Sequence, residues 1–285
     1  MATKLIRFDW AIKKLLRNKA NFTILEGFLT ELLKFDVKIE SILESEGNKE
    51  GFDDKYNRVD ILVRATDGEL MLVEVQNESQ IDYFQRMLYR ASKLITEYIK
   101  EGDPYSEVKK VFSINIVYFG LGQGTDYVYE YEGCFRGIHN GEVLKPTGIQ
   151  QRDFDIVKVA DIFPKYYLLK VNNFDGVAKS KLDEWIYFLK NSEVKDEFEA
   201  KGLNEVREKL KEELLSAEER VAYDKFKKSK KIERSELETA RKEGREEGTI
   251  EIILKMHKKG MATEEIADWL DISVEEVRRV IERFL

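Results

Sequence analysis

The chain has 285 residues, 42% of them hydrophobic and 36% charged, which is enough for one sizeable core with an appendage or for two domains. A single cysteine excludes a disulfide framework, and the chain shows neither a run of roughly 18 apolar residues nor a secretion signal, so we expect a soluble cytoplasmic protein with no membrane partner. The formal charge of −7 excludes an overall attraction to nucleic acid, so DNA binding would depend on a local basic surface.

The first predicted elements are two amphipathic helices, over about 9–17 and 21–35, in which apolar residues recur at spacings of three and four. Basic residues surround a single acid, Asp9, in this opening segment. They are Lys4, Arg7, Lys13, Lys14, Arg17 and Lys19. This cluster is either an ordinary solvated helix face or the local basic surface that DNA binding needs, and in the second case Lys13 and Lys14 are candidates for DNA contact.

The next segment, "VDILVRATDGELMLVEVQ", has the pattern of a β-hairpin, with two β-rich runs around a loop at 66–68. Side chains alternate along a strand, so Glu74 and Gln76 project from one face near its C-terminal end. A three-residue loop that ends with Gly68 in the left-handed conformation places Asp60 opposite Glu74. A two-residue loop would shift the register by one residue and put the two acids on different faces. The three-residue loop therefore predicts two neighbouring carboxylates on one face of the sheet.

Two carboxylates opposed across a pair of strands repel each other by a few tenths to about 1 kcal/mol, and burial strengthens the repulsion. A hard divalent cation such as Mg²⁺ removes this conflict, because it prefers oxygen ligands. Asp60, Glu74 and the carbonyl oxygen of Val75 could supply three of them. The spacing equally allows two exposed acids at a sheet edge, or an ion pair between Glu74 and a lysine or arginine.

A long amphipathic helix is predicted for "QIDYFQRMLYRASKLITEYIK", ending near Gly102 and Pro104. The apolar, β-branched run "VFSINIVYFG" follows, as expected of a strand buried on both faces. Helices and strands alternate, which predicts an α/β core with a mixed sheet. The "GLGQG" segment lacks the Gly-Lys-Ser/Thr of a phosphate loop and predicts a turn. Cys134, His139 and His257 show neither zinc-ligand spacing nor a recognisable Cys–His or Ser–His nucleophile.

The composition changes twice in the C-terminal part, which predicts a domain at 1–190, a charged helical connector at 191–248 and a small helical module at 249–285. Gly244 and Gly248 predict a flexible break before the module. Within the module, Gly260 ends a helix, Thr263 caps the next, and Ser273 opens a third with a capping box. The layout is that of a helix-turn-helix, with Arg278 and Arg279 as candidate DNA contacts, or of a packing or dimerisation module.

The acid pair and its surroundings resemble a known family. "RVDILV" followed by "EVQ" resembles the D…(D/E)-x-K site of the PD-(D/E)XK nucleases, and most resembles the branch of nuclease-family transposases and recombination-promoting nucleases, which carries Gln at the usual lysine position. "FDWAIKKLL" is similar to that family's Asp-containing opening helix. "QRMLYRASKLITEYIKEGDPYSEVKKVFSINIVYF" and "LDEWIYFLKN" resemble its later segments, so the likeness covers most of the chain.

The resemblance implies a restriction-endonuclease-like α/β/α core and Mg²⁺-dependent cleavage of DNA, with Mn²⁺ as a substitute. It implies that Asp60 and Glu74 are metal ligands, that Gln76 stands at the lysine position, and that Asp9 is an additional catalytic acid, with Glu26 as a weaker candidate. Gln76 can orient a water molecule but carries no charge, so the site could be slower, inactive or assisted by another cation. Candidates for that cation, and for DNA contact, are Arg86, Arg90 and Lys93; solvated side chains or structural ion pairs are the alternative.

Three functions therefore compete. The first is a metal-dependent endonuclease linked to recombination or mobile elements, acting on DNA as a monomer or homo-oligomer. The second is a catalytically weak DNA-binding or regulatory protein that keeps the nuclease fold. The third is an interaction scaffold built from the charged helices.

Overall fold

The structure is a computed structural model that describes residues 5–14, 18–43, 61–99 and 101–284. It divides into two units, Met1–Leu215 and Ser216–Leu285. Each unit has its own hydrophobic cluster. Asp60 lies outside the described residues, and so does the whole segment 44–60 that joins the first two strands.

The first unit is built on one six-stranded mixed sheet in the order β1-β2-β3-β4-β6-β5. The strands are β1 (Ile39–Leu43), β2 (Ile61–Ala65), β3 (Leu70–Gln76), β4 (Val111–Val117), β5 (Val128–Tyr131) and β6 (Lys165–Lys170). The central neighbours β3, β4 and β6 run parallel, whereas the β1–β2, β2–β3 and β5–β6 pairs are antiparallel. The predicted α/β fold with a mixed sheet is confirmed.

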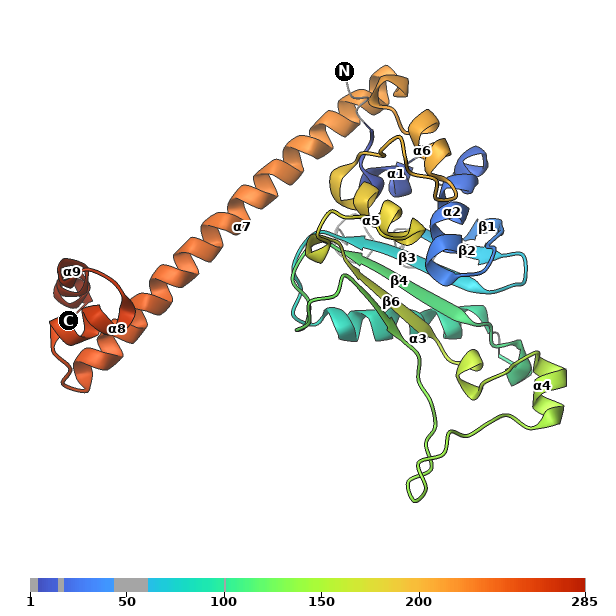
Figure 1. The fold of residues 1–285 in the computed structure, drawn as a ribbon, viewed down its shortest axis with the longest axis horizontal. Coiled ribbons are helices and arrows are strands. Elements are labelled where there is room, and N and C mark those ends of the chain that lie inside the picture. Colours follow the sequence, from blue (N-terminus) through green and yellow to red (C-terminus); the bar gives the residue numbers. More distant parts are fainter. Residues whose placement is uncertain (1–4, 15–17, 44–60, 100, 285) are drawn as a thin grey trace. The chain divides into compact units, whose positions relative to one another are not determined.

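Helices cover both faces of this sheet (Figure 1). On one side lie α1 (Phe8–Lys14), α2 (Phe22–Leu33), α5 (Lys181–Asn191) and α6 (Leu203–Lys209), and on the other lies α3 (Tyr83–Tyr98). A further short helix, α4 (Gly148–Phe154), lies beyond the ends of the strands. The first two helices begin and end close to the bounds that the apolar spacing predicts. The three layers are those of an α/β/α core.

The face with several helices has an aromatic centre. Trp185 is fully buried, and its ring lies 5.5 to 6.4 Å, centroid to centroid, from Phe8, Phe28 and Phe188. Its indole N–H donates to the carbonyl oxygen of Lys201 at 3.1 Å, so α5 holds the loop before α6. The same loop passes so close to α2 that only glycine fits at position 27.

Replacing Gly27 by alanine is therefore expected to destabilise the first unit by about 1–3 kcal/mol. A Cβ atom there would overlap the carbonyl oxygen of Lys201 and lie 2.7 Å from the Cα of Gly202, so backbone must move. Gly248→Ala is the matched control, because that helical glycine has no neighbour within 4 Å. Alanine at 248 should stabilise its helix by about 1 kcal/mol. Urea unfolding of each unit measures both effects.

The hairpin has the predicted register. Arg64 pairs with Leu70 and Ile61 with Val73, and the three-residue loop ends at Gly68 with φ of +88°. The loop is closed by two hydrogen bonds, from the Gly68 amide to the Ala65 carbonyl and from the Ala65 amide to the carbonyl of Glu69, both at 2.9 Å. This is the register from which the pairing of positions 60 and 74 was predicted.

Glu69, the residue before β3, has a partly buried carboxyl group. Burial, and then the neighbouring Asp67, raises the pKa of Glu69 from 4.5 to about 7. The charged form is thus disfavoured in the folded state: the cost is absent below the unfolded pKa and complete above about pH 7. We expect Glu69→Gln to raise the melting temperature relative to the wild type at pH 8 but not at pH 4. Glu78→Gln, at an exposed carboxylate, should show no such dependence.

Residues 191–215 differ from the predicted charged connector, because they pack on the first unit. Leu203, Val206 and Leu210 are fully buried, and the Ile6 amide donates to the Leu210 carbonyl at 2.7 Å. A bridge between Leu5 and Lys211 continues this pairing. Enough apolar side chains are interspersed among the charges to form a buried helix face, which the overall composition concealed.

The second unit begins with α7 (Ala217–Lys258), a continuous helix that runs through Gly244 and Gly248, so the predicted flexible break is wrong. Its last turns pack with α8 (Thr263–Leu270) and α9 (Val274–Phe284) around a small cluster of buried residues: Ile253, Ile266, Ala267 and Val277. Gly260 follows α7 with φ of +86°, as predicted. The hydroxyl of Ser273 accepts from the Glu276 amide at 3.2 Å. Ala262, rather than Thr263, is the N-cap of α8.

No helix among the described residues is long and apolar enough to cross a membrane.

Candidate active site

The candidate residues gather where β3 and β4 end, between α1 on one face of the sheet and α3 on the other. Glu74 and Gln76 point to the α3 face, because they share the strand face of Leu70 and Leu72, which belong to the cluster beneath that helix. Glu74 is 3% exposed, and Gln76 is half-buried. The acid therefore lies inside the sheet–helix interface, and the amide lies at its margin.

Glu74 forms an ion pair with Arg90 of α3. Both side chains are almost completely buried. This is one of the alternatives that the spacing allowed, and it changes the environment of both groups. Arg90 is a predicted DNA contact, but its side chain points into the protein toward Glu74. Contact between Arg90 and DNA stays a prediction. Among the described residues, neither Glu74 oxygen has a hydrogen-bond donor apart from this ion pair.

Asn115 of β4 lies beside Glu74 in the parallel register and is fully buried. Its amide nitrogen donates to the Ser113 hydroxyl at 3.0 Å and to the carbonyl oxygens of Ser113 and Tyr167. Its side-chain oxygen accepts from the Tyr83 hydroxyl at 3.3 Å. The side chain thus ties β4 to β6 and to α3 beneath the acid. Asn115 is not among the residues predicted from the sequence, although Ser113 and Asn115 stand two residues apart in an apolar strand as Glu74 and Gln76 do.

Gln76 ends β3. Its side-chain amide donates to the carbonyl oxygen of Glu78 at 3.4 Å, and its backbone carbonyl accepts from the Tyr118 amide at 3.0 Å. Within the part of the chain that the structure describes, this long contact is the one hydrogen bond of the Gln76 side chain. The side chain can therefore turn toward a water molecule or a substrate without breaking a buried hydrogen bond.

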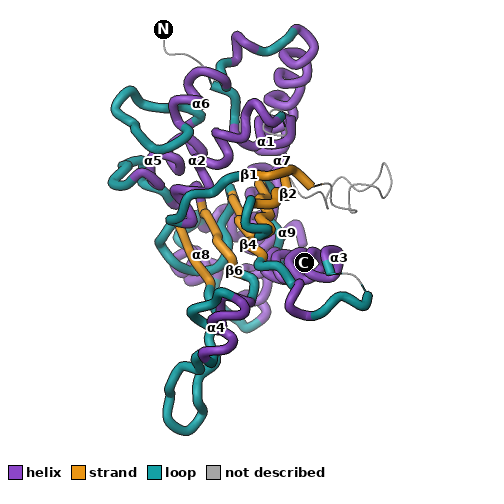
Figure 2. The backbone as a smooth tube through the Cα atoms, turned by 90° about the vertical axis from the view of Figure 1, so that its right-hand side faces the viewer, coloured by secondary structure: helices purple, strands orange, loops and turns teal. Residues whose placement is uncertain are grey.

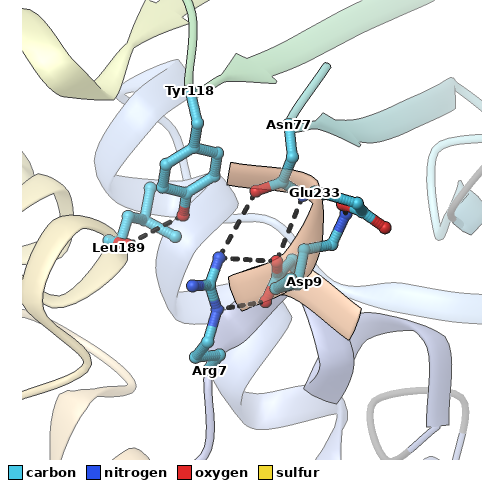
Figure 3. Close-up of polar contacts among 7 residues, drawn as sticks. Arg7, Asp9, Asn77, Tyr118, Leu189 and Glu233 are labelled. Carbon is cyan, nitrogen blue, oxygen red and sulfur yellow. Dashed lines mark hydrogen bonds and ion pairs between the residues drawn. The ribbon is translucent and has the colours of Figure 1, made fainter. Parts of the chain in front are cut away.

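Asp9 occupies the other face of the same sheet end (Figure 3). Arg7 donates two hydrogen bonds to the Asp9 carboxylate, at 3.0 Å from Nε and at 2.8 Å from Nη2. The side-chain amide of Asn77 donates to the same carboxylate at 3.2 Å, and its oxygen accepts from Arg7 at 3.3 Å. The side chain of Asp9 is 3% exposed and that of Arg7 36%. These contacts join the start of α1 to the residue that follows β3.

Tyr118, the first residue after β4, completes this group. The Arg7 guanidinium lies 5.9 Å from the centre of its ring, and its hydroxyl donates to the Leu189 carbonyl at 2.8 Å (Figure 3). Burial, with the nearby Asp9 carboxylate, raises the pKa of Tyr118 well above its usual range. The phenol stays protonated and serves as a hydrogen-bond donor, linking the sheet end to α5.

Glu26 contributes to the fold at a different place. Its carboxylate accepts from the Ile39 amide at 2.9 Å and pairs with Lys38 at 3.4 Å. It therefore holds the start of β1 to α2, and its catalytic role stays a prediction.

The remaining candidates are distributed over several surfaces. Arg86 donates to Gln80 at 2.7 Å and lies over the Tyr83 ring, and Lys93 pairs with Glu97 at 3.6 Å on the surface of α3. In the second unit, Arg278 pairs with Glu264 at 3.1 Å, and Arg279 is exposed. The side chains of Lys13 and Lys14 lie outside the described part.

The "GLGQG" segment is a bend after β4, and two of its backbone carbonyl oxygens point at the ammonium group of a lysine side chain. The buried Lys170 donates to the carbonyl oxygens of Gly122 and Gly124 at 3.5 and 3.3 Å. A phosphate loop presents amide N–H groups instead, so these contacts agree with the prediction of a turn.

Metal ligands cannot be assigned from the described residues alone. Within ranges 5–14, 18–43, 61–99 and 101–284, no three His, Cys, Asp or Glu side chains gather closely enough to hold an ion. Asp60, the predicted partner of Glu74, is outside those ranges. The predicted ligand set of Asp60, Glu74 and the Val75 carbonyl therefore stays a prediction.

A three-layer α/β/α core that carries an acid-x-Gln sequence at the end of a hairpin strand is the architecture of a PD-(D/E)XK nuclease. The profile of the PD-(D/E)XK nuclease family transposases matches residues 6–240, and the chain belongs to this family. Membership implies phosphodiester hydrolysis and DNA as the substrate class. Neither the curated proteins nor the solved structures contain a significant match.

Proposed function

We propose that the chain is a Mg²⁺-dependent DNA endonuclease that hydrolyses phosphodiester bonds during recombination or the movement of mobile elements. The observation that supports the proposal is the hairpin register in a chain of a nuclease family. Glu74 and Gln76 share one face at the end of β3, and the same register continued by one residue from Ile61 and Val73 would put position 60 opposite position 74.

The described donor set fits a hard cation. Glu74 offers a buried carboxylate, and a bound metal ion would replace its present positive partner, Arg90. When bound, Mg²⁺ would lower the pKa of a water molecule and neutralise charge that develops on the phosphate. Asp60 and Glu74 are the carboxylates that would hold it, together with the Val75 carbonyl.

The other residues of the site act on water and on charge. Gln76 lies beside Glu74 on the same face and can orient the attacking water through its amide. Arg90 provides the positive charge that glutamine lacks, and it neutralises Glu74 when no metal is bound. On the other face of the sheet, the Asp9 carboxylate binds both Arg7 and Asn77 and so holds the start of α1 against the end of β3. Asp9 is thereby a positioning residue for the site.

DNA contact is assigned to basic residues of α1, of α3 and of the second unit: Lys13, Lys14, Arg86, Lys93, Arg278 and Arg279. Arg86 and Lys93 lie on α3, which also carries Arg90. The surface ion pair of Lys93 with Glu97 is weak enough to be exchanged for a phosphate contact, since such pairs contribute about 0–1 kcal/mol.

The proposal is tested with supercoiled plasmid DNA and the purified full chain. Mg²⁺ or Mn²⁺ should support nicking, EDTA should stop it, and added metal in excess of the EDTA should restore it. Calorimetric titration with Mn²⁺ should show binding in the absence of DNA. A chain that binds Mn²⁺ but leaves plasmid intact would contradict the endonuclease proposal.

A second function is favoured by the Glu74–Arg90 ion pair itself. If Arg90 keeps the carboxylate from binding metal, the chain is a DNA-binding or regulatory protein with an inactive nuclease fold. In that case DNA binding persists in EDTA, and neither Mn²⁺ binding nor nicking is observed. The scaffold alternative predicts no DNA binding and a stable oligomer that depends on residues 193–248.

A further inference from the structure

The connection between β5 and β6 extends far beyond the sheet. Residues 132–163, here termed the arm, leave the end of β5 and return to the start of β6 by way of a narrow projecting loop and α4 (Figures 1 and 2). β5 itself is the outer strand of the sheet. Neither the proposed metal site nor the basic candidates use any residue of the arm.

The arm has a defined backbone. Its tip is a small hairpin in which the Leu144 amide donates to the Phe135 carbonyl and the Gly137 amide to the Glu142 carbonyl, at 2.9 and 2.8 Å. Thr147 and Gln150 form a capping box at the start of α4. The Asp161 carboxylate accepts from the Val157 and Lys158 amides at 2.9 and 2.7 Å. Hydrogen bonds of this kind indicate a surface of fixed shape.

The apolar side chains of this well-bonded segment face solvent. Nine of the 24 exposed large hydrophobic residues of the described chain lie in the arm, which is a far larger share than its length predicts. They are Phe135, Ile138, Val143, Leu144, Ile149, Phe154, Val157, Ile162 and Phe163. Ile138 at the tip is 95% exposed. Apolar surface gathered in one segment marks an interaction site, whereas scattered exposed residues do not.

The charge of the arm selects the kind of partner. The segment contains four basic and five acidic residues, which are interspersed along the chain. DNA and anionic membranes attract surfaces with a positive excess, which the arm lacks. Two copies of the chain repel each other through a net charge of −7 each, and a nearly neutral segment is where they can approach most closely. Mixed charges also allow Arg136 of one copy to face Glu142 of the other.

We propose that the arm is the surface through which two copies of this chain associate, arm against arm, about a two-fold axis. In such an isologous interface the same patch of each copy contacts its partner, so every apolar side chain of the patch is buried once on each side of the two-fold axis. The centre of the interface would be formed by Phe135, Ile138 and Leu144, which surround the tip. The inference concerns assembly and holds whether or not the chain cleaves DNA.

The only cysteine of the chain provides a direct test. Cys134 lies in the arm next to Phe135 and is exposed. A short bis-maleimide should therefore convert the full-length chain into a covalent dimer, and Cys134→Ser should abolish that product. Absence of the dimer band for the wild type, at concentrations where sedimentation shows a dimer, would overturn the proposal.

Sedimentation velocity of the full chain measures the association itself. Ile138→Asp with Leu144→Asp should raise the dimer dissociation constant at least ten-fold and remove the cross-link. Leu214→Asp is the matched control, because Leu214 and Leu144 are 60% and 59% exposed and only Leu144 is in the arm. A wild-type monomer, or a dimer that the arm variants leave intact, would overturn the proposal. So would arm variants that lose DNA binding with no change in dimerisation, because the arm would then be a DNA contact.

Discussion

Alanine at Glu74 or at Asp60 is expected to abolish metal-dependent nicking of plasmid DNA, with a fall in rate on the order of 10²- to 10³-fold or more. Each change removes a carboxylate from the proposed metal site, and nothing among the described neighbours can replace it. The Arg90 guanidinium repels a cation, and Asn115 is committed to Ser113, Tyr83 and Tyr167. The rate is measured at saturating Mg²⁺ with equal amounts of folded protein.

Two further variants make the result specific. Glu78→Ala removes an exposed carboxylate four residues after Glu74, and it should leave nicking unchanged. Glu74→Gln preserves the size of the side chain and removes its negative charge. If the charge binds the metal, this variant should lose nicking activity as fully as Glu74→Ala does. Equal residual nicking in all four preparations would point to a contaminating nuclease and would remove the support for this site.

The hairpin shows what local sequence can predict. Loop length and the glycine at 68 decide the register, and both act within a few residues. The direction of Glu74 and Gln76 then follows from strand alternation, which the structure bears out. The two opening helices are predicted equally well, because apolar spacing is also a local signal.

The contacts of the acids could not be predicted in the same way. Glu74 pairs with Arg90, which lies sixteen residues later on α3, so this pair depends on how α3 packs on the sheet. Asp9 accepts from Asn77, which follows β3, so that contact depends on how α1 packs. Asn115 was overlooked because an apolar strand that contains one amide still has the pattern of a buried strand. These residues take their roles from tertiary contacts, which composition and spacing do not encode.

The continuous helix α7 shows a different limit. Gly244 and Gly248 were expected to interrupt it, but each glycine costs an exposed helix only about 1 kcal/mol relative to alanine. Forty-two residues rich in Glu, Lys and Arg supply enough helix propensity to offset that cost. The strands β5 and β6 were missed because the arm separates them by far more than a turn, so no hairpin signal marks their pairing.

Replacing Arg90 by methionine is expected to destabilise the first unit by about 3–5 kcal/mol. The change leaves the Glu74 carboxylate buried beneath α3 without its counter-charge. Adding Glu74→Gln removes the stranded charge, so the double variant should recover most of the loss. Lys93→Met breaks a surface pair with Glu97 on the same helix, and it should cost no more than about 0.5 kcal/mol. Urea unfolding followed by tryptophan fluorescence gives the free energy of unfolding of the wild type and of the three variants.

Adding Mg²⁺ to the same series connects stability with function. A cation that binds the folded state alone stabilises it in proportion to its affinity. Methionine at 90 removes the charge that competes for Glu74, so Mg²⁺ should raise the unfolding midpoint of Arg90→Met more than that of the wild type. The double variant lacks the carboxylate and should gain nothing. An equal gain in all variants would mean that the ion binds elsewhere, and the assignment of Glu74 as a ligand would fail with it.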